Sequence, residues 1–403
     1  MLIVQKFGGT SVGDLQRIQN VANRVSKTRK EGHDVVVVVS AMSGETNKLV
    51  AYAEHFSKNP SRAEMDMLLS SGERVTASLL AIALQEMGHD AVAMTGRKAG
   101  IVTDDSHTKA RIEDINPATM LESIEAGKII VVAGFQGVNI AGDVTTLGRG
   151  GSDLSAVAIA GAIKADLCEI YTDVSGIFTT DPRIEPKAKK LEKISYDEML
   201  ELASMGAKVL QNRSVEMAKK LNVNLVTRTS FSDEEGTLIT KEENIMEAPL
   251  VSGIALDRNQ ARISLMGVKD RPGIASEIFN KLADAEVNVD MIIQNKAHDG
   301  TTNIDFTVAT GDLFDAKAVV DTFVDEGEIK ADSYNEDICK VSVVGVGMKS
   351  HTGVAAKAFT TMAENNININ MISTSEIKIS MVINEKYAEL AVRGLHDAYE
   401  LDK

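Results

Sequence analysis

Lys6-Phe7-Gly8-Gly9-Thr10-Ser11-Val12 is the stretch that indicates how the N-terminal part of the chain folds. It follows the apolar residues Leu2-Ile3-Val4 and precedes a run with apolar residues at helical spacing, so it predicts a strand, a glycine turn and a helix. Two adjacent glycines let the backbone approach a bulky anion, and the N–H groups that follow favour negative charge. Lys6 can direct an ammonium group to the same place. A tight turn beside a surface lysine is the alternative interpretation of this stretch alone.

Length and composition limit the class of protein. At 403 residues the chain is too long for one ordinary domain, so we expect two or three. The formal net charge of −15 argues against nucleic acid or an anionic membrane as a partner. Cys168 and Cys339 form no metal or redox motif, so we expect reduced thiols and a cytoplasmic location. We also expect no signal peptide and no membrane span, since no stretch approaches about 20 apolar residues.

Short apolar runs alternate with helical patterns up to about residue 230. Val35–Val39 has the composition of a strand that is buried on both faces. The alternation predicts α/β architecture with a mostly parallel central sheet in three layers. Further strands are expected at 91–94, 129–133, 169–173 and 223–227. Helical patterns run through 64–87, with an interruption at 70–74, and through 154–165 and 196–220.

A second glycine-rich loop, Leu147-Gly148-Arg149-Gly150-Gly151-Ser152-Asp153, opens the helical pattern at 154–165. Ser152 or Asp153 is expected to cap that helix. Arg149 is a natural bidentate partner for a carboxylate or a phosphate. Close packing of the glycines, with Arg149 paired to a surface acid, is the alternative. Two glycine loops that each carry a cation favour an anion-binding site.

The part of the chain after a charged segment at 230–249 contains an internal repeat. Pro272-Gly273-Ile274-Ala275 and Thr352-Gly353-Val354-Ala355 lie 80 positions apart, and the same offset relates Val287-Asn288-Val289 to Ile367-Asn368-Ile369. Each copy predicts strand, helix, strand and strand, which is a small α+β sandwich with its helices on one face.

The motifs at 6–12, 148–153 and 171–174 (Tyr-Thr-Asp-Val), in this order, resemble those of the aspartokinase family, and the repeat resembles paired ACT domains. The resemblance covers essentially the whole chain, which looks monofunctional. It implies a three-layer amino-acid-kinase fold followed by two ferredoxin-like ACT units. The implied boundaries are 1–230 for the catalytic domain, 231–249 for a linker, and 250–335 and 336–403 for the ACT units, the second interlocking with the strand near 250–262.

The same resemblance implies transfer of the ATP γ-phosphoryl group to the side-chain carboxylate of L-aspartate, giving 4-phospho-L-aspartate, on the route to lysine, threonine and methionine. ATP and Mg²⁺ are the implied cofactors, and the metal is carried by ATP without protein ligands. The implied catalytic residues are Lys6, Asp153 and Lys208. The implied aspartate site is Ser40, Thr46, Glu73, Arg149 and Ser152. The implied nucleotide contacts are Lys6, Gly8, Gly9, Thr10, Thr172, Asp173, Phe178, Asp181, Arg183 and Lys208.

Elementary chemistry agrees with this assignment. A carboxylate, with an ordinary pKa of about 4, is already an ionised nucleophile at neutral pH, so no general base is required. The task is to bring two anions together and to disperse charge on the phosphoryl oxygens, which suits Lys6, Lys208 and Mg²⁺. Asp153 would orient the lysines, and Glu73 would face the substrate ammonium. Without the resemblance, Glu73 is equally well a solvated helix carboxylate, and Lys208 a surface lysine.

The repeat implies regulation by lysine, threonine or both, and a homo-oligomer formed through exposed sheet edges of the ACT units. The implied effector residues are Asp270, Arg271, Pro272, Gly273, Ile274, Ala275, Gln294, Asn295, Asn368 and Ile369. Two other functions remain open: phosphorylation of a different acid or of a nucleoside monophosphate, and a non-catalytic amino-acid sensor.

Overall fold

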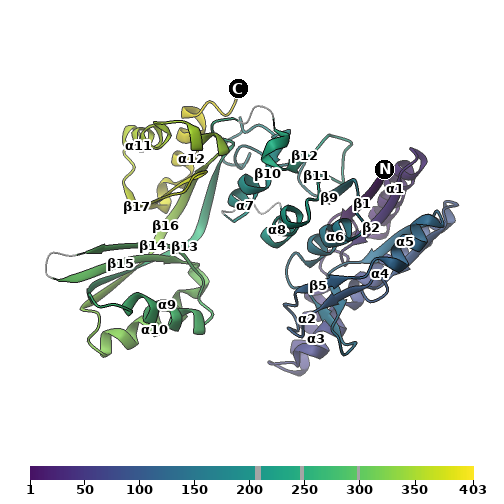
Figure 1. The fold of residues 1–403 in the computed structure, drawn as a ribbon, viewed down its shortest axis with the longest axis horizontal. Coiled ribbons are helices and arrows are strands. Elements are labelled where there is room, and N and C mark those ends of the chain that lie inside the picture. The colour runs from purple at the N-terminus through teal and green to yellow at the C-terminus, as the bar shows by residue number, and fades with distance from the viewer. Residues whose placement is uncertain (205–209, 246–248, 297–299) are drawn as a thin grey trace. The chain divides into compact units, whose positions relative to one another are not determined.

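The structure is a computed structural model that describes residues 1–204, 210–245, 249–296 and 300–403 (Figure 1). The chain forms two compact units. The first holds Met1–Ile177, Lys190–Ala203 and the described part of Lys208–Glu247. The second holds Phe178–Lys189 and the described part of Ala248–Lys403.

The first unit is built on a mostly parallel sheet, as the sequence predicts. Its strand order is β10-β12-β11-β9-β1-β2-β6-β3, and the β11–β12 pair is the antiparallel one. Val35–Val39 in β2 is wholly buried, which confirms the expected central strand. The strands are β1 (Leu2–Phe7), β2 (Asp34–Val39), β3 (Ala91–Met94), β6 (Ile129–Ala133), β9 (Leu167–Thr172), β10 (Lys193–Ser195), β11 (Leu225–Thr229) and β12 (Thr237–Thr240).

Helices cover both faces of this sheet. Val35, Val37 and Val39 share a core with α1 and α4, whereas α6 contacts β1, β2 and β9 and is buried along most of its length. The interruption expected at 70–74 separates two helices that meet at Ser70, and the described residues of the pattern at 196–220 also form two helices. The helices are α1 (Leu15–Lys30), α2 (Glu45–Phe56), α3 (Arg62–Leu69), α4 (Ser71–Glu86), α5 (Ala118–Glu125), α6 (Gly151–Ala162), α7 (Tyr196–Ser204) and α8 (Asn212–Leu221).

A small second sheet with the order β5-β4-β7-β8 has no counterpart in the sequence prediction. Its strands are too short to give a periodic signal. They are β4 (Ile101–Thr103), β5 (Ile112–Ile115), β7 (Gln136–Val138) and β8 (Val144–Thr146).

The helical run Arg62–Glu86 is long and apolar enough to cross a membrane by length and composition alone. Half of its most apolar window is buried inside the protein, where Ala77, Leu80 and Leu84 of α4 belong to the core beneath β2. Core helices of this kind pass the same test, so the run carries no argument for a membrane span.

The segment expected to be a linker contains β12, which pairs with both β10 and β11 in the first-unit sheet. Its sequence is charged and rich in turn residues, which concealed the four-residue strand. Thr237 is fully buried; its hydroxyl accepts a hydrogen bond from the Ile177 N–H (2.8 Å) and donates one to the Leu191 carbonyl (2.6 Å). Thr237 therefore joins the two places where the chain leaves and re-enters the first unit.

Replacing Thr237 by valine should lower the free energy of unfolding by about 1–3 kcal/mol, because the buried Ile177 N–H loses its acceptor. Chemical denaturation followed by circular dichroism measures this. The exposed Thr119→Val in α5 serves as the control and should change little. Equal stability of the two variants would contradict the structural role of Thr237.

The second unit is one antiparallel sheet with the order β14-β15-β13-β16-β18-β17. The long strands β13 and β16 pair from Gly253↔Val344 to Met266↔Ala331, so each passes through both repeats. α9 and α10 lie side by side on one face of the sheet in Figure 1. The elements are β13 (Gly253–Lys269), α9 (Ile274–Asp284), β14 (Val289–Lys296), β15 (Thr301–Val308), α10 (Leu313–Asp325), β16 (Ala331–Val344), α11 (Val354–Glu364), β17 (Ile369–Thr374), β18 (Lys378–Asn384) and α12 (Ala388–Ala398), with short 3₁₀ turns at Thr310–Asp312, Val346–Ser350 and Glu385–Tyr387. A further 3₁₀ turn, Glu242–Asn244, belongs to the first unit.

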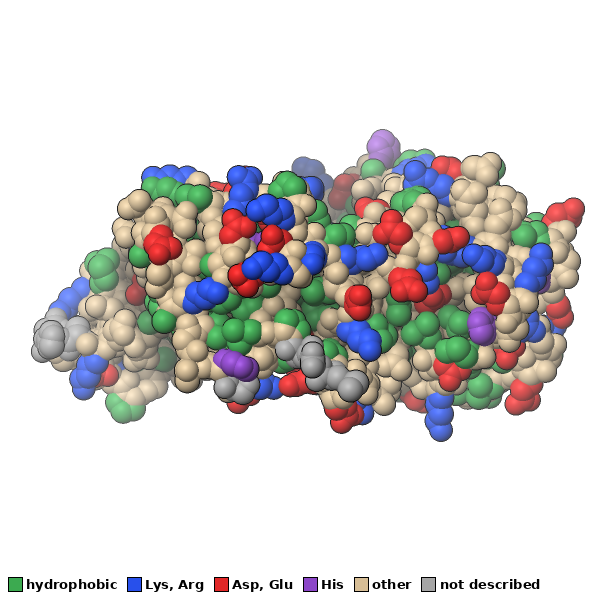
Figure 2. All heavy atoms as spheres, turned by 90° about the horizontal axis from the view of Figure 1, so that it is seen from above, with side chains coloured by type: hydrophobic (Ala, Val, Ile, Leu, Met, Phe, Trp, Pro, Cys, Tyr) green, Lys and Arg blue, Asp and Glu red, His purple; other side chains and the backbone are tan. Residues whose placement is uncertain are grey.

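The internal repeat is visible in the backbone. α9 and α11 begin 80 positions apart, and each is preceded by a glycine in the left-handed region, Gly273 (φ 98°) and Gly353 (φ 88°). Each copy ends with a helix, α10 or α12, that the predicted strand–helix–strand–strand order lacks. On the face drawn in Figure 2, acidic and basic side chains are interspersed over the coloured residues, without a broad basic area.

Candidate active site

The carboxyl ends of β1, β2, β6 and β9 meet at one edge of the parallel sheet. Lys6 of β1 lies opposite Val38 of β2 and Ile170 of β9, and the Ser40 N–H donates to the Phe7 carbonyl (3.1 Å). In open α/β sheets ligands bind at this edge. The first motif and the strand ends predicted from sequence are therefore brought together.

Lys6 and Asp153 form an ion pair at this edge, and both residues are nearly fully buried. Lys6 is the second-last residue of β1, while Asp153 lies in the first turn of α6, which packs against β1. A buried ammonium requires such a partner because desolvation of an unpaired charge is costly. The structure thus joins the two predicted glycine motifs through one charged contact.

The glycine pair allows a close approach of backbone and ammonium. A Cβ atom on Gly8 would lie 3.3 Å from the Lys6 Nζ, and one on Gly9 would lie 3.1 Å from the Ala41 carbonyl oxygen. The turn continues to Asp14, whose side chain accepts from the Arg17 N–H (2.8 Å) and caps α1 at Leu15. The N-terminus of α1 therefore already faces a carboxylate. Loop N–H groups and Lys6, rather than that helix end, are the groups that remain for an anion.

Glu73 of α4 reaches the loop after β2. Its Oε1 accepts from the Ala41 N–H (3.0 Å), while its Oε2 is buried without a hydrogen-bond partner among the described residues. Burial raises the pKa of Glu73 to about 7, against the opposing effect of the Ala41 hydrogen bond. A buried carboxylate with one unused oxygen suits a cationic ligand group.

Arg149 is exposed and stands between two glycines in the left-handed region, Gly148 (φ 76°) and Gly150 (φ 72°). The helix after this loop begins at Gly151 with Gly150 as its N-cap residue, so the predicted cap by Ser152 or Asp153 is wrong. Both side chains instead lie in the first turn and are buried. Ser152 packs against Gly134 at the end of β6, where a Cβ would lie 3.0 Å from the Ser152 Oγ, and Asp153 pairs with Lys6.

Other predicted residues of the first unit have more open positions. Thr46 is half-buried in the first turn of α2, and Thr10 is exposed in the glycine turn. Thr172 ends β9, where its hydroxyl donates to the exposed Asp173 carboxylate (3.0 Å).

Three predicted nucleotide contacts, Phe178, Asp181 and Arg183, fall in the segment that groups with the second unit. The guanidinium of Arg183 pairs with Asp181 (2.7 Å), and this hydrogen bonding holds the pKa of the Asp181 carboxyl below its usual value. The predicted Lys208 lies outside the described residues.

The segment is held by groups of the second unit. The Ile254 N–H donates to the Thr179 carbonyl (2.7 Å), the Thr179 hydroxyl contacts the buried His396 Nε2 (3.0 Å), and the Arg393 Nε donates to the Ile184 carbonyl (2.8 Å). Burial lowers the pKa of His396, which favours the neutral ring, whose Nε2 can accept a hydrogen bond from the Thr179 hydroxyl. Nothing in the sequence pattern indicated this attachment.

The predicted effector loop lies between β13 and α9. Asp270 pairs with Lys296 at the end of β14 (3.3 Å), which brings the loop beside the exposed Gln294 and Asn295. Arg271 is occupied by two acids: it binds Glu277 bidentately (2.7 and 2.6 Å) and also binds Glu328 (3.2 Å). The backbone after Gly273, at Ile274 and Ala275, begins α9, whereas Asn368 and Ile369 stand at the start of β17.

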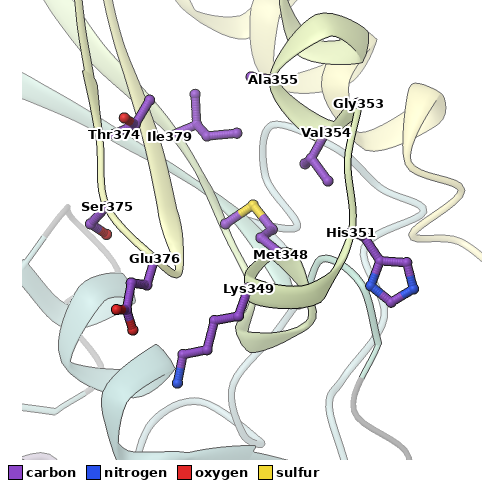
Figure 3. A pocket seen from close by; sticks show the side chains of 10 residues that line it. All are labelled: Met348, Lys349, His351, Gly353, Val354, Ala355, Thr374, Ser375, Glu376 and Ile379. Atoms are coloured by element: carbon purple, nitrogen blue, oxygen red, sulfur yellow. The ribbon is translucent and has the colours of Figure 1, made fainter.

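A pocket occupies the equivalent place in the second repeat (Figure 3). Gly353, Val354, Ala355 and Thr374 line it, and these are the positions 80 residues after Gly273, Ile274, Ala275 and Gln294. In Figure 3 the Met348 side chain lies between the β17–β18 hairpin and the start of α11. Applying the offset to Gln294 would have found this pocket from the sequence.

Two buried groups near the site escaped sequence reasoning. Tyr171 stacks on Phe7 (ring centroids 4.6 Å apart), and its hydroxyl donates to Glu169 (3.0 Å). Asp66 of α3 is fully buried and accepts several hydrogen bonds. Tyr171 opens the motif at 171–174 but was given no role of its own, and the isolated Asp66 belongs to no motif. Within the described residues, no group of three His, Cys, Asp or Glu side chains could hold a metal ion.

Comparison with known proteins assigns the family. The model of the amino acid kinase family matches residues 1–227, and ACT domain models match residues 262–328 and 341–399. The aspartokinase of Helicobacter pylori (strain J99 / ATCC 700824) is 58% identical over 407 residues, which cover 100% of both chains. The chain belongs to the aspartokinase family. The resemblance drawn from three short motifs is therefore confirmed, and so are the kinase class and the fold.

Solved structures of the family have the same architecture. Escherichia coli aspartokinase III in complex with aspartate and ADP (R-state) has a TM-score of 0.82 and 27% identity, covering 99% of each chain. The same enzyme in complex with lysine and aspartate (T-state) has a TM-score of 0.79 and 27% identity, covering 98% of this chain and 99% of that one.

The raised pKa of Glu73 predicts a pH dependence for the binding of a substrate ammonium group. Only the ionised carboxylate can pair with the ammonium, so kcat/KM for aspartate should fall as the pH drops through about 7. Initial rates between about pH 6 and 8 measure this. Glu73→Gln should have a lower but flatter profile, and an unchanged inflection in that variant would assign the titration to another group.

Proposed function

We propose that this chain transfers the γ-phosphoryl group of ATP to the side-chain carboxylate of L-aspartate, giving 4-phospho-L-aspartate. The observation that carries the proposal is the buried Lys6–Asp153 pair beside the Gly8–Gly9 turn, at the carboxyl ends of the parallel strands. The 58% identity to an aspartokinase over the full length of both chains supports the choice of substrate. The product would enter the biosynthesis of lysine, threonine and methionine in the cytoplasm.

Lys6 would stabilise charge on the transferring phosphoryl group, and Asp153 would keep the ammonium in place without contributing a proton. The Lys6 Nζ lies at the glycine turn, 3.3 Å from where a Cβ on Gly8 would stand. Because the ammonium is preorganised and buried, its interaction with developing charge is stronger than it would be in water. We assign Gly8, Gly9 and Thr10 to the phosphates, with Thr172 and Asp173 on the nucleotide side.

Aspartate would be held by groups of opposite charge. We assign Arg149 to a substrate carboxylate and Glu73 to the ammonium, with Ser40, Thr46 and Ser152 as smaller polar contacts. The substrate carboxylate attacks directly, since it is already ionised. Mg²⁺, held by the phosphates of ATP, would neutralise charge on them.

The first test is a hydroxylamine assay, which converts an acyl phosphate into a hydroxamate. Mg-ATP with L-aspartate should give aspartate hydroxamate, and neither glutamate nor UMP should replace aspartate. Lys6→Ala should lower kcat a hundredfold or more, corresponding to roughly 3 kcal/mol of transition-state stabilisation. Wild-type turnover by Lys6→Ala would contradict the phosphate-loop assignment, and ligand binding without turnover would favour an amino-acid sensor.

We further propose that the second unit makes the enzyme responsive to lysine, threonine or both, and that it joins copies of the chain. The lysine complex of aspartokinase III supports lysine as one candidate effector. For the effector we assign Asp270, Gly273, Ile274, Ala275, Gln294 and Asn295, with Asn368 and Ile369 from the second repeat. Exposed isoleucines on the edge strands β14 and β17, Ile292 and Ile372, support association through sheet edges.

The segment Phe178–Lys189 offers a route for this regulation. It carries Asp181 and Arg183, which we assign to the nucleotide. Its backbone carbonyls accept from Arg393 and from the Ile254 N–H of β13, and the Thr179 hydroxyl is hydrogen-bonded to His396. A rearrangement of that unit would therefore move the nucleotide contacts. An effector that binds one arrangement more tightly would then change ATP binding.

Arg393→Ala tests this route because it removes the hydrogen bond to the Ile184 carbonyl. Wild-type activity should be inhibited by lysine, threonine or the pair, and Arg393→Ala should need at least about tenfold more effector for half inhibition. Arg258→Ala is a matched control, since Arg258 also pairs with Glu389 and its other ion pair is with Glu385, outside the segment. An equal rise in the effector concentration for half inhibition in both variants would contradict the route. A wild-type enzyme that responds to neither lysine nor threonine would contradict the proposed regulation.

A further inference from the structure

Asp66 is a carboxylate without any exposed surface, outside the residues assigned so far. It lies on α3 and accepts from the His107 Nδ1 (2.7 Å), from the Thr108 N–H (3.1 Å to each oxygen) and from the Thr146 hydroxyl. Because a carboxylate that accepts these bonds has no proton to give, the Nδ1 of His107 carries the hydrogen. The described hydrogen bonds of the Asp66 side chain thus all come from the loop at 107–108 and from β8, which lie far from α3 in the sequence.

Thr108 connects Asp66 to the second glycine loop. Its backbone is in the left-handed region (φ 68°), which is uncommon for a β-branched residue and is maintained here by the two-oxygen bond from its N–H to Asp66. The Thr108 carbonyl lies against Gly148: a Cβ on Gly148 would be 3.2 Å from that oxygen. The position of Gly148 therefore depends on the conformation that Asp66 imposes on Thr108.

Thr146 provides a second connection to the same place. It ends β8, its hydroxyl binds Asp66, and its carbonyl accepts from the Ala110 N–H (2.9 Å). Arg213 of α8 adds two further hydrogen bonds by donating to the carbonyls of Leu147 (2.7 Å) and Ala110 (3.0 Å). Asp66 thus holds Thr146, Arg213 holds Leu147, and the Thr108 carbonyl lies against Gly148. The next residue along the chain is Arg149.

We propose that Asp66 is a positioning residue for aspartate binding. It fixes Thr108 and Thr146 so that the short loop after β8 presents Arg149 to the substrate carboxylate. Asp66 touches no substrate itself, and the inference rests on the proposed role of Arg149 as the clamp. It assigns to the buried carboxylate a function in substrate affinity rather than in phosphoryl transfer, which depends on Lys6 and Asp153.

The test compares Michaelis constants of the full-length enzyme. Asp66→Asn keeps the shape but points an amide donor at groups that are themselves donors, so the loop should relax. The KM for aspartate should rise at least tenfold, while the KM for ATP stays within twofold of wild type. Asp114→Asn, an exposed aspartate on β5 of the same small sheet, is the matched control and should leave both constants unchanged.

A double-variant comparison separates positioning from a general structural role. Arg149→Ala should raise the KM for aspartate, and adding Asp66→Asn to it should raise that constant by no more than a further twofold, because both changes remove the same contact. The inference would be overturned if the two substitutions raised the KM for aspartate independently, so that their factors multiplied. It would also be overturned if Asp66→Asn raised the KM for aspartate and the KM for ATP equally.

The proposed clamp and this inference fail in different ways. If Arg149→Ala leaves the KM for aspartate unchanged, the clamp is wrong and the inference falls with it. If Arg149→Ala raises that constant but Asp66→Asn does not, only the inference is overturned. Should Asp66→Asn not fold, Thr146→Val removes a single donor and should still raise the KM for aspartate at least threefold; an unchanged value would overturn the inference.

Discussion

The ion pair between Lys6 and Asp153 is the contact on which the site depends. It joins the end of β1 to the first turn of α6, and it supplies a desolvated positive charge at the edge where ligands reach an α/β sheet. Neither partner tolerates burial alone, so each glycine loop needs the other. Gly8 lies at the same point and brings the backbone close to the ammonium, since a Cβ there would be 3.3 Å from the Lys6 Nζ. The Lys6–Asp153 pair therefore determines both where the positive charge lies and where the glycine backbone beside it runs.

Much of the fold and part of the site followed from sequence because their signals are local. Val35–Val39 has no polar residue, so a strand covered on both faces was the direct prediction. Lys6 and Asp153 were each marked by a glycine loop, and the parallel strand order places their loops at one edge. The repeat was equally clear, since its glycines recur at one offset and both adopt positive φ.

What the sequence concealed depends on contacts between distant segments. Asp66 and Thr146 are 80 residues apart, and no spacing rule connects an acid on a helix with a hydroxyl at the end of a strand. The cap at Gly150 was missed because Ser152 and Asp153 are better capping types, yet burial against Gly134 and Lys6 takes both side chains into the protein. The attachment of residues 178–189 to the second unit is likewise a tertiary property that turn residues and prolines do not encode.

The two ACT repeats preserve a backbone and change its chemistry. Gly273 and Gly353 begin their helices in the same way, but the acid-bound Arg271 of the first loop is replaced at the offset of 80 by His351, and Gln294 by Thr374. Since a pocket discriminates ligands through its few polar groups, equal backbones with different side chains favour different ligands. Both repeats have the same order of strands and helices, whereas the side chains that would recognise an amino acid differ between the two copies. The pair of repeats is thus better described as two distinct candidate sites on one sheet than as one site repeated.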